Sequence, residues 1–212
     1  MSIKTATNMT CQRLVAGEAK VQSLTTTGST TTTVGLGAKN GSTLTSTEYG
    51  NDVIHRTRLT FLATPITITD VGGTIQYGGV KVYDFPQGLL CFMGAVVTGN
   101  ITGGVTGTII DTWTGSIALG SVTAAGDNDL TATEANFLKK TAVTQAAAKV
   151  AAVDAVSLCT ATTETVAQWI DGTATAVDLF LNLIVTDDAT HTSGTVAFTG
   201  TIEFAWMNLG DN

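Results

Sequence analysis

The amino-acid sequence predicts an all-β, mainly antiparallel protein, and three features of its composition support this. Threonine fills 42 of the 212 positions, and β-branched side chains favour strands. The 23 glycines are suited to the turns between strands, whereas proline occurs only twice. Charged residues make up 13% of the chain, about half of the usual share. Disorder requires high charge and low hydrophobicity, and helical bundles require abundant Glu, Lys, Leu and Arg, so both classes are excluded.

The first quarter of the chain is the least regular part. Residues 1–20 show no clean periodicity, and we expect them to form an irregular N-terminal arm. Residues 21–212 are expected to form a single β-sandwich domain with a Thr-rich segment at 21–50. The run at 25–33 is polar and low in complexity, which fits either a loop or an exposed strand.

The clearest early strand covers residues 53–61. Leu59 and Phe61 point to one face and Arg56 and Arg58 to the other, which is the period of a half-buried strand. Alternation continues after Pro65, where we expect a sheet edge or a bulge because proline donates no backbone hydrogen bond.

The middle of the chain contains three further predicted strands. After a turn at Gly72, a strand is expected around residues 80–85. Residues 89–97 are almost continuously apolar, as expected for a central strand covered on both faces, and Cys91 is expected to be buried there. Shorter strands are expected at 106–110 and 113–119.

One short helix is predicted between these strands and the last third of the chain. Thr131 and Glu134 have the spacing of a capping box, and a helix from there to Lys140 would match the helix dipole. The Ala-rich residues 145–153 fit either a helix or a strand of small residues.

The last third has the strongest strand pattern. Residues 179–186 and 195–206 both alternate, and a polar loop separates them, so we expect an antiparallel pair. About eight strands with frequent turn signals predict a β-sandwich that resembles a jelly roll, with one short helix and the N-terminal arm.

Charge and hydropathy limit the partners of this protein. The net charge is −7, all ten basic residues lie at or before Lys149, and residues 150–212 contain eight acids. A nucleic-acid surface needs clustered Lys and Arg, so we expect none. The acidic end either meets a positive partner or supports solubility. No signal peptide, membrane span or disulfide framework is indicated, and synthesis in a cytosol is expected.

Few residues have the chemistry of a catalytic or metal site. His55 lies on a predicted strand without a nucleophile pattern nearby, and we interpret it as a surface or partly packed residue. Asp187, Asp188 and His191 are weak candidates for metal ligands, because a polar cluster of this kind is more typical of a solvated loop between two strands. We therefore expect no enzymatic activity, no cofactor and no bound metal.

Acidic and aromatic residues elsewhere offer two weaker alternatives. The acids between 127 and 134 have a faint likeness to a calcium loop but lack its spacing, so a capping loop is preferred. Trp113, Trp169 and Trp206 fit either a sugar-binding surface or the core, and their strand positions favour the core.

Three segments resemble virion proteins of tailed bacteriophages that are described as structural or capsid-decorating. They are YGGVKVYDFP at 77–86, DGTA at 171–174 and FAWMNLGDN at 204–212, and the likeness extends from about residue 50 to the end. It contains no catalytic signature.

The resemblance implies a decoration (cement) protein on the capsid exterior, made in the cytoplasm of the host bacterium. Its partners would be the major capsid protein and further copies of itself, as a dimer or trimer. The candidate interface residues are Arg13, Lys20, Arg56 and Arg58. The alternative function is a carbohydrate- or host-receptor-binding β-sandwich module of a phage fibre or cell surface.

Overall fold

Within the described part of the chain, the protein consists of two antiparallel β-sheets. The computed structural model describes residues 24–27, 43–50, 54–72, 75–106, 113–126, 129–144, 150–158, 169–186 and 193–210. In these ranges helical conformation is confined to Thr43 and the 3-10 turn η2 (Ala132–Glu134). The predicted all-β, antiparallel fold class is therefore confirmed.

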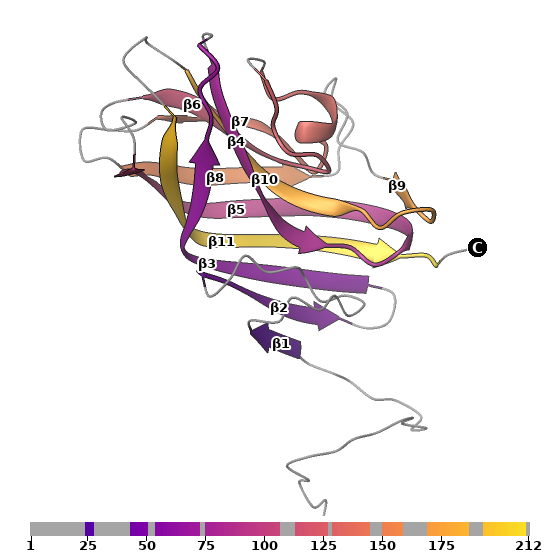
Figure 1. The fold of residues 1–212 in the computed structure, drawn as a ribbon. Helices are drawn as coiled ribbons and strands as arrows, with labels where there is room; N and C mark the ends of the chain where they lie inside the picture. The colour runs from indigo at the N-terminus through magenta and orange to yellow at the C-terminus, as the bar shows by residue number, and fades with distance from the viewer. Residues whose placement is uncertain are drawn as a thin grey trace, which may run out of the picture.

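The two sheets differ in size (Figure 1). The larger sheet has the order β1 (Leu24–Thr27), β2 (Leu44–Gly50), β3 (Ile54–Ile68), β11 (Gly194–Asn208), β5 (Gly88–Thr106) and β8 (Val150–Leu158), and β9 (Trp169–Gly172) also pairs with β5. The smaller sheet has the order β4 (Ile75–Asp84), β10 (Asp178–Thr186), β6 (Thr114–Gly120) and β7 (Leu138–Thr144).

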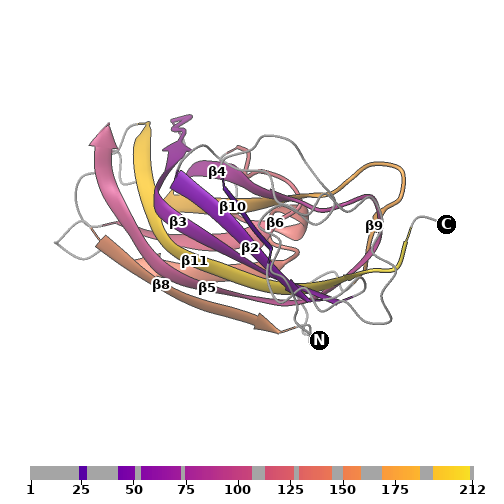
Figure 2. The same ribbon diagram turned by 90° about the horizontal axis from the view of Figure 1, so that it is seen from below.

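The hydrophobic core lies between the two sheets, which Figure 2 shows as separate layers. Aromatic rings from both sheets meet there at close range. Tyr83 of β4 lies 5.1 Å from Phe204 of β11, and Phe92 of β5 lies 4.7 Å from Phe137, measured between ring centroids. Each such buried ring contributes roughly 1.5–3 kcal/mol through the apolar surface that it removes from water.

Strand β3 has the predicted faces and a bulge close to the predicted position. Leu59 and Phe61 are buried, and the adjacent side chains of Arg58 and Thr60 are exposed. The register with β11 shifts at Ala63, which has a φ of 50°. This extra residue switches the buried positions from odd to even numbers, so that Ile66 is buried as well. Pro65 follows the bulge, beyond the stretch that pairs with β2, as expected for an edge position.

Strand β5 is central, as predicted, but it is not covered on both faces. It pairs with β11 on one side and with β8 and β9 on the other. Its outward side chains Leu89 and Val96 are 36% and 40% exposed, and Cys91 is only partly buried. The expectation of a buried Cys91 was therefore wrong, because among the described residues only the core side of this sheet meets a second layer.

Strands β10 and β11 do not form the predicted antiparallel pair. β10 pairs with β4 and β6 in the smaller sheet, whereas β11 pairs with β3 and β5 in the larger one. Both strands have one fully apolar side, and both bury it in the same core. The alternation correctly identified these two strands. It did not predict their pairing, because two strands bury their apolar sides equally well in opposite sheets and as neighbours in one sheet.

The predicted helix is reduced to the turn η2. Lys139 and Lys140 belong to strand β7, where Leu138 and Val143 are buried in the core. Burial of these two side chains in the core between the sheets outweighs the local helix signal. Strand β8 resolves the alternative for the Ala-rich segment in favour of a strand from Val150 onward. Strand β1 likewise places part of the Thr-rich segment in the larger sheet, paired with β2.

Candidate functional site

The candidate site is the side of the larger sheet that points away from the core, which we call the outer face. Its outward side chains are Thr45, Thr47 and Tyr49 on β2; Ile54, Arg56, Arg58 and Thr60 on β3; Thr201, Glu203, Ala205 and Met207 on β11; and Gly94, Val96 and Thr98 on β5. Two of the four predicted interface residues, Arg56 and Arg58, therefore lie on one surface.

A single carboxylate lies between these two arginines. Glu203 is the cross-strand partner of Arg58, and its Oε1 lies 3.3 Å from Arg58 Nε. Its Oε2 accepts a hydrogen bond of 3.1 Å from Arg56 Nε and contacts Arg56 Nη2 as well. Two guanidinium groups share one carboxylate, so this part of the outer face keeps a net positive charge in a chain of net charge −7.

The arginines remain available to a partner. Their side chains are 64% and 49% exposed, so their ion pairs with Glu203 contribute little to stability. The hydrogen bond to Glu203 and its negative charge raise the pKa of Arg56. The guanidinium is therefore charged at neutral pH.

The rest of the outer face on these four strands is uncharged. Thr45, Thr60, Thr201 and Thr98 are consecutive cross-strand partners and form a row of threonines across β2, β3, β11 and β5. A second row consists of Ile54, Met207, Cys91 and Trp169. Ile54 is 49% and Trp169 is 55% exposed, and clustered exposed apolar side chains are typical of interaction surfaces.

The opposite surface of the molecule is covered by the segment between β6 and β7. Asn182 on β10 holds this segment with three hydrogen bonds: its Oδ1 accepts from the Ala124 amide at 2.9 Å, and its Nδ2 donates to the carbonyls of Val122 and Glu134 at 2.8 Å each. Leu130 packs beneath the segment in a small second core. The two sheets thus differ, since the smaller one has its outward side covered.

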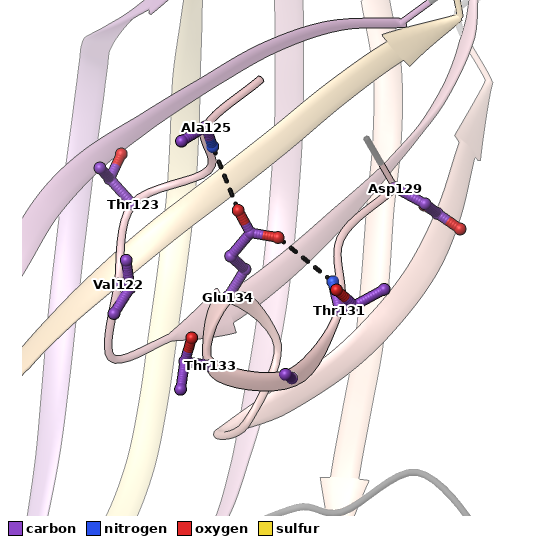
Figure 3. A pocket seen from close by; sticks show the side chains of 8 residues that line it. Val122, Thr123, Ala125, Asp129, Thr131, Thr133 and Glu134 are labelled. Carbon is purple, nitrogen blue, oxygen red and sulfur yellow. Dashed lines mark hydrogen bonds between the residues drawn. The ribbon is translucent and has the colours of Figure 1, made fainter. Parts of the chain in front are cut away.

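A hollow of about 520 Å³ opens within this covering segment (Figure 3). Glu134 lies at its centre, where its carboxylate accepts hydrogen bonds from the amides of Ala125 at 3.1 Å and Thr131 at 3.3 Å. Asp129 accepts from the Leu130 amide at 2.9 Å and pairs with Lys140. Both carboxylates are occupied in holding the loop, which agrees with the preferred interpretation as a capping loop.

The hollow has neither of the features expected of a metal or sugar site. Its lining residues are Val122, Thr123, Ala125, Asp129, Thr131, Ala132, Thr133 and Glu134, which include no aromatic ring on which a sugar would stack. Across the described residues, no group of three or more His, Cys, Asp or Glu side chains is placed to hold a metal ion.

A polar network at one end of the core involves His55. Its ring stacks on Trp206 at 4.1 Å, and its Nδ1 lies 2.5 Å from Glu48 Oε1. The Tyr83 hydroxyl donates to Glu48 Oε2 at 3.2 Å, and Trp206 Nε1 donates to Thr57 Oγ1 at 3.0 Å. Burial and the nearby Glu48 charge raise the pKa of Tyr83. His55 is therefore partly packed, as predicted, and the network joins β2 to β3, β4 and β11.

A second charged cluster lies on the smaller sheet. Lys81 Nζ contacts the carboxylates of Asp84 and Asp178, the latter at 2.9 Å. Burial and a hydrogen bond with Asp178 raise the pKa of Asp84 even though Lys81 opposes that shift. This cluster was not predictable from local patterns, because the Asp84–Asp178 pair depends on the register of β4 against β10.

This raised pKa predicts a pH dependence of stability. The folded state binds the Asp84 proton more tightly than the unfolded chain, so its stabilising contribution is fully present below the unfolded pKa and is lost as the pH rises through the folded pKa. We expect urea unfolding to show a decline in stability over this window, and Asp84→Asn to remove it.

Asp171→Asn is the matched control for that experiment. Hydrogen bonds from Thr173 lower the pKa of Asp171, so its contribution is lost only as the pH falls. A decline that persists in Asp84→Asn, or disappears in Asp171→Asn, would contradict the assignment.

Several predicted residues lie outside the described residues: Arg13, Lys20, Asp187, Asp188 and His191, as well as the predicted arm at 1–20. The tryptophans divide between two environments. Trp113 and Trp206 are buried in the core, as predicted, whereas Trp169 on the short strand β9 is exposed, and the core expectation was wrong for it. The neighbouring residue Ile170 packs against the core, so Trp169 points to the opposite side of β9.

Glu203 is the main residue of the site that the sequence reasoning did not select. The alternation of β11 already placed it outward, and it is the one acid at an outward position of that strand. Its pairing with Arg56 joins residues 147 positions apart, so no local signal connects them.

Comparisons with known proteins add no relationship. No protein-family model, curated protein or solved structure matches this chain. Among the described residues, no helix is long and apolar enough to cross a membrane.

Proposed function

We propose that this protein is a virion structural protein of a tailed bacteriophage that binds the outer capsid lattice as a decoration protein. The observation that carries the proposal is the broad, weakly charged outer face. A lattice-binding protein needs wide complementary surfaces, and a standard interface buries about 800 Å² on each partner. The proposal assigns no catalytic step to the chain.

The strand order supports a jelly roll as the scaffold. Strands β3, β11, β5 and β8 lie in one sheet, and β4, β10, β6 and β7 lie in the other. In this order the chain crosses between the sheets as it does in two interlocked Greek keys, and β1, β2 and β9 are additions at the margins. Jelly rolls are common in viral capsid and lectin domains, which favours the proposal over an enzyme but does not separate virion from lectin functions.

The composition of the outer face suits association with a large surface. Removing charged groups from water costs free energy. On the described strands β2, β3, β11 and β5, the charged residues at outward positions in the rows that cross all four strands are only Arg56, Arg58 and Glu203. Threonine side chains along the same strands are smaller and easier to desolvate.

The N-terminal end of the sheet offers a second contact. β1 is the edge strand of the larger sheet and, among the described strands, pairs with β2 alone. An edge strand presents main-chain groups to which another chain can add, and residues 1–20 precede it in the sequence. We propose these residues as the arm that reaches the capsid, with Arg13 and Lys20 as its candidate contacts.

Deleting residues 2–20 is expected to weaken capsid binding at least tenfold while the sandwich stays folded, since the described core begins at Leu44. Binding is measured by co-sedimentation with capsids that lack the protein, and folding by thermal melting. Unchanged capsid occupancy of the truncated protein would contradict the role of the arm.

Electron cryo-microscopy of virions from the phage that carries this gene tests the proposed function directly. Density for the two-sheet domain on the capsid exterior is expected, and capsids made without the gene should lack it. Virions without the protein, or density confined to the tail, would overturn the proposal.

One observation favours the second candidate, a carbohydrate- or receptor-binding module. Trp169 is 55% exposed beside the polar turn at Asp171, and exposed tryptophan is a common sugar-stacking residue. A glycan array tests this candidate: binding that Trp169→Ala abolishes supports it, and the absence of binding leaves the decoration role as the favoured function.

A further inference from the structure

We propose that the outer face binds a second copy of this chain, across a two-fold axis that runs parallel to the strands between β3 and β11. In a two-fold interface each residue meets a partner that it also faces in return, so the surface must be complementary to itself. This inference names a second copy as the partner of the outer face, which leaves the edge strand β1 as the contact with the capsid. It does not depend on capsid binding.

The charges of the outer face meet this requirement. Arg58 and Glu203 are cross-strand partners on either side of the proposed axis. When two copies pack face to face, the axis places Arg58 of each copy opposite Glu203 of the other. Each carboxylate then lies among guanidinium groups from both copies, and Arg56 of each copy lies opposite the uncharged Ala205 of the other.

The uncharged rows obey the same symmetry. The partners Ile54 and Met207 exchange places across the axis, which puts apolar side chains against each other. Thr60 and Thr201 do the same in the threonine row.

Shape is complementary one strand further from the axis. β2 and β5 lie at equal distances on the two sides of the axis. Tyr49 on β2 is in register with Arg56, and Gly94 on β5 is in register with Ala205, the partner of Arg56. The axis therefore places Tyr49 of one copy opposite Gly94 of the other. Tyr49 is 36% exposed and projects from the sheet, whereas Gly94 has no side chain. A ring from each copy therefore meets an open position on the other.

The outer face is close in size to a standard interface. The axis places β3 opposite β11 and β2 opposite β5 of the second copy, and β3, β11 and β2 contain 15, 15 and 7 residues. At about 3.3 Å per residue and about 4.8 Å between strands, the projected area of these strands and of the matching length of β5 is on the order of 700 Å². A standard interface needs about 800 Å² per partner, and sheets that pack face to face align within about 30°.

Complementary charge variants test the proposal. The acidic variant carries Arg56→Glu and Arg58→Glu, and the basic variant carries Glu203→Arg. Each alone places like charges across the axis, so we expect its dimer dissociation constant to rise at least about tenfold over that of the wild type. An equimolar mixture should recover dimers, because acidic and basic faces then meet.

Light scattering coupled to size-exclusion chromatography gives the masses, and thermal melting checks that each variant is folded. Lys139→Glu on β7 is the matched control, and its dimer should match the wild type, because β7 belongs to the other sheet. If a charge variant fails to fold, Ile54→Asp replaces it, since Ile54 is exposed in the monomer and its carboxylates would separate the copies.

Three results would each overturn the proposal. The first is a monomeric wild type, and the second is a dimer that survives in both charge variants or in Ile54→Asp. The third is a mixture of folded charge variants that stays monomeric. None of these results involves the capsid. If the protein dimerises but is absent from virions, the dimer proposal therefore stands and the proposed function is wrong.

Discussion

Asn182→Ala is expected to lower the free energy of unfolding by about 3–5 kcal/mol. The Asn182 side chain is fully buried and makes three hydrogen bonds to the backbone of the segment that covers the smaller sheet. Alanine leaves the Ala124 amide and the carbonyls of Val122 and Glu134 without these partners, and each unsatisfied buried group costs about 1–3 kcal/mol. Water that enters the space would reduce the sum.

Urea unfolding at one fixed protein concentration measures this effect, because self-association would otherwise change apparent stability. Asn100→Ala is the matched control: Asn100 is exposed on β5, and its replacement should change stability by less than about 0.5 kcal/mol. Hydrogen exchange should also show faster exchange of the Ala124 amide in Asn182→Ala. Equal stability of the two variants would show that the covering segment does not depend on Asn182.

Trp206→Ala is expected to destabilise the protein by about 3–5 kcal/mol. The ring is fully buried, stacks on His55 at 4.1 Å and lies 5.4 Å from Phe85, and its Nε1 donates to Thr57. Truncation leaves a cavity and removes the support of the polar network through which β2 is held.

Trp169→Ala separates this effect from the general loss of an indole ring. Trp169 is 55% exposed, so we expect a change of less than about 0.5 kcal/mol in the same urea experiment. If Trp206→Ala does not fold, Trp206→Phe keeps most of the ring and should still lose about 1–2 kcal/mol through the hydrogen bond to Thr57. Similar losses for Trp169→Ala and Trp206→Ala would contradict the placement of Trp206 in the core.

The faces of individual strands were predictable because alternation is a local property. Leu59 and Phe61 turned inward and Arg56 and Arg58 outward in β3, and the apolar side of β11 is buried as the sequence predicts. The outward position of two candidate interface residues follows from this pattern alone. Their shared carboxylate does not, because Glu203 reaches them only through the pairing of β11 with β3.

The errors have one common origin in non-local packing. The helix signal at Thr131 and Glu134 is real locally, but burial of Leu138 draws the following residues into β7. Asn182 occupies an outward position in β10, where a polar side chain is normally solvated, yet the segment between β6 and β7 covers it. Neither result is encoded within the few residues that determine a helix or strand period.

The fold class, the existence of most strands and the direction of their side chains follow from the amino-acid sequence. A threonine-rich, weakly charged chain with period-2 alternation has few other ways to bury its apolar residues. Only the folded molecule shows which strands pair, that β10 and β11 lie in opposite sheets, and that the segment between β6 and β7 covers the outward side of the smaller sheet. Those outcomes depend on competition between surfaces far apart in the chain, because any strand with one apolar side can bury it equally well against several partners.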